Sequence, residues 1–140
     1  MTTSQIPIAR WPLTTGARAA RSRAATAALW AAQIAAAAMF LFAGTLKLTG
    51  APMMVAMFDV IGIGQWFRYL TGSIEVVSAI LLLIPSLALF GALLLLPTMV
   101  GAVLTHLFIV GGSPAIPIVL LALTIAIAWT RRSQPRRSQQ

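Results

Sequence analysis

A single apolar stretch covers residues 26–130 and is interrupted by only a few acidic, basic or imidazole side chains, namely Lys47, Asp59, Arg68, Glu75 and His106. A backbone in hydrocarbon must satisfy every polar group within helices or within a closed barrel. The apolar runs are rich in Ala and Leu and lack the alternation of barrel strands. Only 9% of the residues are charged, against about a quarter in soluble domains. The sequence therefore predicts an all-α polytopic membrane protein.

Glycines, prolines and charged residues divide this stretch into four expected spans, over residues 24–48, 69–85, 87–110 and 114–130. Between the first two spans, residues 52–61 predict a short apolar helix about 15 Å long, half the depth of a bilayer core. Only Pro85 and Ser86 separate the second and third spans, which favours an antiparallel hairpin. Pro97 is expected to kink the third span. The predicted fold is a four-transmembrane-helix bundle with one interfacial helix between helices 1 and 2.

The net charge of +8 comes mainly from the two ends of the chain, which carry Arg10, Arg18, Arg21, Arg23, Arg131, Arg132, Arg136 and Arg137. Positive residues flanking spans mark the cytoplasmic side, and four spans place both ends together. We therefore expect a basic cytoplasmic tail over residues 1–23, irregular or lying on the membrane surface. A transmembrane domain over 24–130 and a second basic cytoplasmic tail over 131–140 follow, in the cell membrane. Nucleic-acid binding is disfavoured, because only Trp11 interleaves the basic residues with an aromatic ring.

Two ionisable residues, Glu75 and His106, lie within spans, where such groups persist only when paired or functional. The predicted topology places both at one depth in the outer half of the membrane, with Lys47 and Arg68 just above them. Small and hydroxyl residues fall on the same helix faces, at Thr71, Gly72, Ser78 and Ala79 and at Gly91, Thr98, Gly101, Ala102 and Thr105. The candidate buried polar site is therefore Lys47, Arg68, Thr71, Glu75, Thr105 and His106.

Each of these residues also has a structural interpretation. Lys47 fits a snorkelling anchor better than a site residue, because lysines near span ends commonly reach the headgroups. Arg68 fits an anchor and a partner of Glu75 equally well. Glu75 and His106 are expected to be coupled, and whether that coupling is structural or functional stays open.

Three segments of the chain resemble the DoxX-like family: FAGTLKLTG (residues 42–50), FDVIGIGQWFRYLTGSIEVVSAILLLIP (58–85) and GALLLLPTMVGAVLTHL (91–107). The most specific parts of this resemblance are Lys47, the Gly-x-x-Glu pattern ending at Glu75 and the Gly-Ala-x-x-Thr-His pattern ending at His106. The resemblance implies four membrane helices. The namesake of the family is a membrane subunit of a thiosulfate:quinone oxidoreductase, which implies a link to quinones.

The function favoured by these observations is an accessory or interaction subunit of a membrane complex, with a link to quinones left open. The alternative is a small membrane redox enzyme, or a solute- or proton-handling protein that uses Glu75 and His106. The chain has no cysteine and one histidine, so one protomer cannot ligate an iron–sulfur cluster or a bis-histidine haem. We expect no metal, no resident cofactor and no activity of the chain alone. A quinone resting against Trp66, Tyr69, Glu75 and His106 is the one cofactor hypothesis. The expected partners are the lipid bilayer and another membrane protein or a second copy.

Overall fold

The computed structural model describes the backbone of residues 13–132 and the side chains of residues 22–132. The elements follow in the order α1 (Leu13–Thr49), α2 (Pro52–Ile61), α3 (Gln65–Leu83), α4 (Ala88–Thr105), the π-helix η1 (His106–Val110) and α5 (Ala115–Arg132). Within this part of the chain there is no strand. Four of its helical segments are long and apolar enough to cross a membrane: Ser22–Thr49, Gln65–Leu83, Ala88–Val110 and Ala115–Arg132. The predicted all-α fold, with four spans and a short apolar helix, is confirmed.

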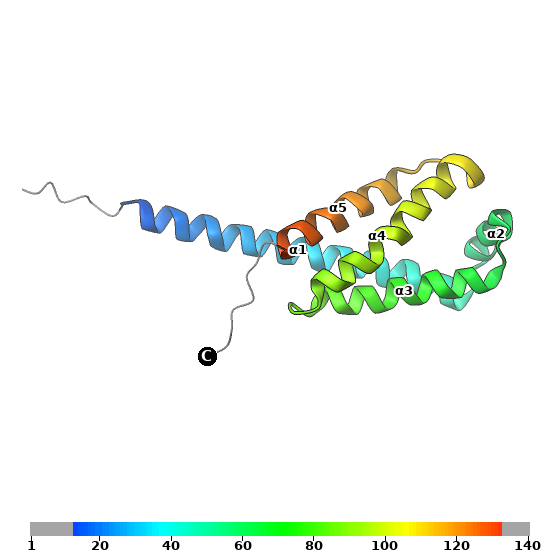
Figure 1. Cartoon of the computed structure of the whole chain (residues 1–140), viewed down its shortest axis with the longest axis horizontal. Coiled ribbons are helices and arrows are strands. Elements are labelled where there is room, and N and C mark those ends of the chain that lie inside the picture. The colour runs from blue at the N-terminus through cyan, green and yellow to red at the C-terminus, as the bar shows by residue number, and fades with distance from the viewer. Residues whose placement is uncertain (1–12, 133–140) are drawn as a thin grey trace, which may run out of the picture.

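The four long helices form one bundle, in which α1 packs along α3, α3 against α4, and α4 against α5 (Figure 1). The short helix α2 and the connection from η1 to α5 lie at one end of this bundle. The end of α5 and the turn between α3 and α4 lie at the other end, beyond which the first turns of α1 extend. The described chain therefore begins and ends on the same side of the bundle.

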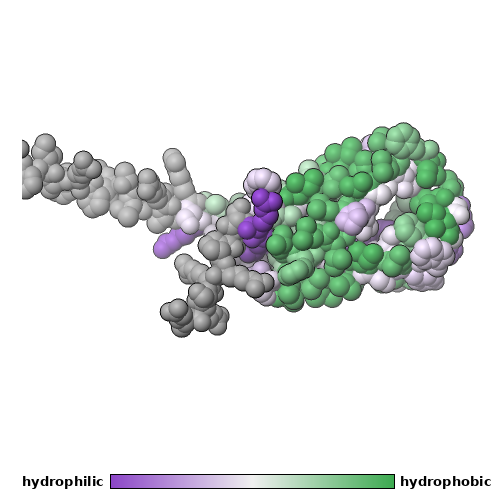
Figure 2. Space-filling view, viewed as in Figure 1, coloured by the Kyte–Doolittle hydropathy of each residue, from purple (hydrophilic) through white to green (hydrophobic). Residues whose placement is uncertain are grey.

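The outer surface of the bundle is apolar, as Figure 2 shows for one face. Large hydrophobic side chains stay exposed on every long helix, including Phe42, Val77, Phe90 and Ile125. A soluble protein rarely exposes a continuous surface of this kind. Lipid-facing helices expose it by default, because lipid tails are as apolar as the side chains. The chain is an integral membrane protein whose bundle surface suits contact with lipid.

The first helix is longer than predicted, because α1 begins at Leu13 and runs through residues expected to form a basic tail that is irregular or lies on the membrane surface. Pro12 directly precedes it, and the segment that follows is rich in Ala and Arg, which are strong helix formers. Residues 1–12 and 133–140, with Arg10, Arg136 and Arg137, lie outside the described residues.

Two further boundaries differ from the predicted ones. Helix α3 begins at Gln65 rather than at Tyr69, directly after Gly64, whose φ of 103° breaks the chain direction. The third span does not end as a regular α-helix, because its last turn is the π-helix η1, which His106 begins. Such π-helical turns are rare in proteins, and those that occur are often found at functional sites.

Glycines bring three helices into close contact. A Cβ atom on Gly72 of α3 would lie 2.9 Å from the Cβ of Lys47 and 3.1 Å from the carbonyl oxygen of Gly44 in α1. A Cβ atom on Gly91 of α4 would lie 2.8 Å from the carbonyl oxygen of Ser78 in α3. Gly101, by contrast, is exposed and has no such neighbour within 4 Å. The expectation that Gly101 belongs to the buried face of α4 is therefore wrong.

The end of the bundle opposite α2 contains a polar cluster that is not among the residues predicted from the sequence. Gln33 of α1 is fully buried, and its Nε2 donates to the carbonyl oxygen of Leu82 at 2.8 Å. Its Oε1 accepts a hydrogen bond from Arg131 Nη2, whose guanidinium lies 5.5 Å from the ring of Trp30. This cluster connects α1, α3 and α5. The one available signal was an isolated amide within an alanine-rich span.

Candidate binding cavity

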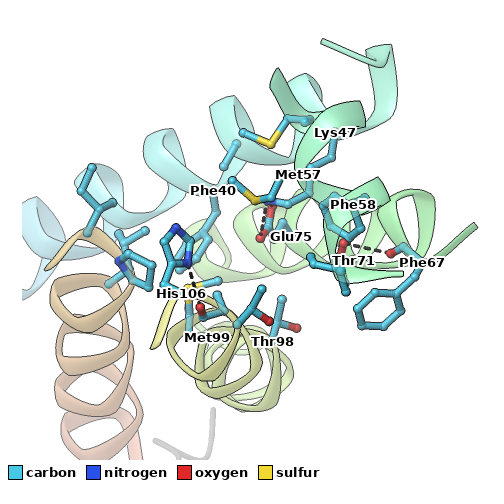
Figure 3. Close-up of a pocket in the computed structure, with 18 of the residues that line it drawn as sticks. Phe40, Lys47, Met57, Phe58, Phe67, Thr71, Glu75, Thr98, Met99 and His106 are labelled. Atoms are coloured by element: carbon cyan, nitrogen blue, oxygen red, sulfur yellow. Dashed lines mark hydrogen bonds and ion pairs between the residues drawn. The ribbon is translucent and has the colours of Figure 1, made fainter. Parts of the chain in front are cut away.

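A cavity of about 250 Å³ lies between the helices at the end of the bundle that carries α2 (Figure 3). The surface is hollowed near this end, as Figure 2 shows. Most of the cavity wall is apolar and includes Phe40, Met54, Met57, Phe58, Phe67, Met99, Ile116 and Leu120. Its polar side chains are Lys47, Thr71, Glu75, Thr98, Thr105, His106 and Ser113. An apolar cavity with a few convergent polar groups is typical of small-molecule sites.

A buried ion pair forms the most polar part of the wall. Lys47 Nζ lies 2.7 Å from Glu75 Oε2 and 3.0 Å from Oε1, and the two side chains are 14% and 2% exposed. Gly44 and Gly72 each lie within one turn of this pair and allow α1 and α3 to approach closely. A carboxylate this deeply buried requires such a partner. The interpretation of Lys47 as a snorkelling anchor is therefore wrong.

Arg68 supports the pair indirectly. Its Nη1 donates to the backbone carbonyl of Lys47, and its Nε donates to Gln65 Oε1 at 2.6 Å. The carbonyl of Lys47 is one of the last in α1, where helices leave their acceptors without an intrahelical partner. The buried guanidinium of Arg68 thus satisfies the end of α1 instead of pairing with Glu75. It holds the turn of helix that carries Lys47.

His106 lies on a different wall of the cavity from Glu75 (Figure 3). Its Nδ1 is 2.9 Å from the carbonyl oxygen of Ala102, one turn earlier on the same helix. The hydrogen bonds found for the Glu75 carboxylate both come from Lys47. The expected coupling of Glu75 with His106 therefore does not take the form of a direct hydrogen bond in the described structure. Both residues, together with Thr71 and Thr105, nevertheless line one cavity.

The two aromatic residues predicted as ring contacts do not line this cavity. Trp66 is 61% exposed and donates from Nε1 to the carbonyl oxygen of Ile63. Tyr69 is 48% exposed and packs under the Arg68 guanidinium, 4.2 Å from the ring centroid. The aromatic wall consists instead of Phe40, Phe58 and Phe67. These read as ordinary apolar residues in the sequence, and only the packing brings them together.

An apolar groove between α1 and α5 adjoins the cavity. It is lined by Ala35, Met39, Ala115, Ile116, Val119, Leu120 and Leu123. Ile116 and Leu120 belong to both linings, so this wall of the cavity is also the wall of the groove. Among residues 22–132, no three histidine or acidic side chains gather in a way that could hold a metal ion.

A family model described as the DoxX-like family matches residues 31–129, which include every residue that lines the cavity. The chain belongs to the DoxX-like family. No curated protein and no solved structure matches it significantly.

In this DoxX-like protein, the residues on which the resemblance was based lie in three kinds of place: at the cavity, at a helix contact and on the outer surface. Lys47, Glu75 and His106 line the cavity, and Gly72 lies at the contact of α1 with α3 that positions the ion pair. Gly101 faces outward. Three of the motif residues are thus brought to one cavity from α1, α3 and η1.

Proposed function

We propose that this DoxX-like protein binds a ring compound of the quinone class in its cavity and serves as an accessory membrane subunit of a quinone-linked complex. The observation that carries the proposal is a largely apolar cavity of about 250 Å³ with a buried ion pair and an imidazole on its walls. The phenylalanine and methionine side chains suit a flat apolar ring, and thioethers adapt to irregular shapes. The polar groups then orient the oxygen atoms at the edges of the ring.

The groove between α1 and α5 favours a ligand that enters from the membrane. Its lining is wholly apolar, and it shares Ile116 and Leu120 with the cavity. A ligand dissolved in the bilayer can reach this wall from the side without crossing the aqueous phase. Electron transfer is assigned to a partner protein, because the sequence has no cysteine and only one histidine with which to ligate a redox centre. A protein partner or a second copy of the chain in the membrane belongs to this proposal.

The proposal predicts that quinone remains bound after gentle purification. Protein prepared in mild detergent and extracted with organic solvent should yield quinone in proportion to protein. Glu75→Gln should lose most of it, because it removes the charge that holds Lys47 at the wall. Ala102→Leu should lose it by filling the cavity. Trp66→Leu is the matched control and should retain it, because Trp66 lies outside the cavity.

Absence of quinone from the unaltered protein, together with no rebinding of an added short-chain quinone, would contradict the proposal. Each variant should first be shown to elute as the unaltered protein does. Loss of quinone in all three variants alike would indicate a general effect on folding rather than an effect on the cavity.

We also propose that both ends of the chain are cytoplasmic, on the strength of the arginine residues at each end. The cysteine-free chain allows single-cysteine labelling without background. Ile63→Cys, in the exposed connection before α3, should react with an impermeant maleimide on intact cells. Ser86→Cys, in the exposed turn between α3 and α4, should react only after permeabilisation. The reverse pattern would invert the proposed orientation.

A further inference from the structure

The polar groups on the cavity wall differ in whether they can donate or accept hydrogen bonds toward a ligand. His106 Nδ1 lies 2.9 Å from the carbonyl oxygen of Ala102, and a carbonyl can only accept. Nδ1 therefore carries the proton. In the neutral imidazole, Nε2 is then an acceptor, because only one of the two ring nitrogens is protonated. His106 offers the cavity a lone pair.

Two threonines on the wall are in a similar state. Thr71 Oγ1 donates to the carbonyl oxygen of Phe67 at 3.0 Å, and Thr98 Oγ1 donates to that of Leu94 at 3.4 Å. Each hydroxyl has one proton, and each of these protons is committed to the backbone. While these hydrogen bonds are kept, Thr71 and Thr98 present acceptors toward a ligand.

The ion pair adds further acceptors and one donor. Two of the three ammonium protons of Lys47 point to the two oxygens of Glu75, which leaves one N–H for a ligand. The ionised carboxylate of Glu75 has lone pairs and no proton. The hydroxyls of Thr105 and Ser113 can serve in either role. With these hydrogen bonds in place, most polar groups on the wall present acceptors toward a ligand.

We infer that the cavity selects a ring that carries hydroxyl groups, a hydroquinone or related phenol, over the same ring with carbonyl groups only. The inference rests on the proposed function and names the form of the ligand. A carbonyl oxygen would meet the lone pairs of His106, Thr71 and Thr98 and leave them without a partner, which is costly once the ligand has displaced water from the cavity. A hydroxyl donates to one of these acceptors and can still accept from Lys47.

Three ligands of one shape test this inference: a short-tailed 1,4-hydroquinone, the matching 1,4-benzoquinone and the 1,4-dimethoxy ether. The ether keeps the oxygen atoms and removes the donors. Anaerobic titration calorimetry of the full chain in mild detergent should measure the three affinities. The Kd of the hydroquinone should be lower than that of either other ligand by about tenfold or more, because one additional hydrogen bond to a wall acceptor has an effect of this size.

Two variants test whether the wall residues cause the tighter binding of the hydroquinone. His106→Leu should remove most of this preference, and Thr98→Val, which changes the shape of the side chain little, should reduce it. Trp66→Leu should leave it unchanged, because Trp66 lies outside the cavity. Thr98→Val also keeps the test decisive should His106→Leu fail to fold.

The outcomes separate the two proposals. Equal affinities for the three ligands, or tighter binding of the benzoquinone, would overturn the selection of hydroxyl groups and leave the quinone-class site intact. A preference that survives in both His106→Leu and Thr98→Val would overturn the assigned acceptors. No binding of any of the three ligands would overturn the proposed function itself.

Discussion

Replacing Lys47 with methionine is expected to lower the free energy of unfolding in detergent by about 3–5 kcal/mol, the usual cost of leaving a buried charge without its partner. The Glu75 side chain is only 2% exposed and has both of its hydrogen bonds from Lys47. Glu75→Gln is expected to cost less. The Lys47 side chain is 14% exposed, and its long stem allows the ammonium to move toward water when the carboxylate is removed.

Reversible unfolding in mixed micelles, with a double-mutant cycle, measures this difference. The combined Lys47→Met and Glu75→Gln variant should lose clearly less than the sum of the two single losses, because removing both charges leaves none unpaired. The control cycle combines Glu75→Gln with His106→Asn. Its coupling should be clearly smaller than in the first cycle, because no hydrogen bond joins these two residues in the described structure. Additivity in the first cycle with coupling in the second would contradict the assigned ion pair.

The same alanine substitution at two glycines of α4 should change stability in opposite directions. At Gly91 the new Cβ atom would lie 2.8 Å from the carbonyl oxygen of Ser78 and 3.0 Å from the backbone nitrogen of Leu82. Backbone atoms cannot move aside as a flexible side chain does, so Gly91→Ala should destabilise by about 1–3 kcal/mol. At Gly101 the new Cβ atom meets nothing within 4 Å. Gly101→Ala should stabilise by about 0.5–1 kcal/mol, because alanine favours the helix over glycine.

Thermal unfolding of the two variants in one detergent compares them directly, since both substitutions add one methyl group to one helix. A lower midpoint for Gly91→Ala and a higher one for Gly101→Ala is the expected result. A loss at Gly101 as large as that at Gly91 would show that the face of α4 carrying Gly101 is covered in the folded protein. Stability unchanged at Gly91 would contradict the close contact of α3 with α4.

The sequence by itself determined the number and order of the spans and, apart from the start of α1, their approximate limits. Hydropathy, span length, and the prolines and glycines at the turns are local properties, and the bilayer restricts a spanning chain to few solutions. The separation of an apolar α2 from the spans followed from its short length and from the glycines and the proline that border it. Glu75 and His106 could also be singled out as candidates, because ionisable groups stand out within apolar spans, whereas Lys47 was expected to be an anchor.

Only the tertiary structure decided which of these groups meet. Lys47 rather than Arg68 or His106 pairs with Glu75, and Gly101 faces outward while Gly91 is buried. These outcomes depend on the rotation and tilt of each helix, which packing against neighbouring helices sets and local sequence does not. The cavity likewise combines residues from every described helix, and the acceptor groups on its wall result from hydrogen bonds made within the folded chain. The sequence indicates which polar atoms within the spans need hydrogen-bond partners, and the packing of the helices determines which groups become those partners.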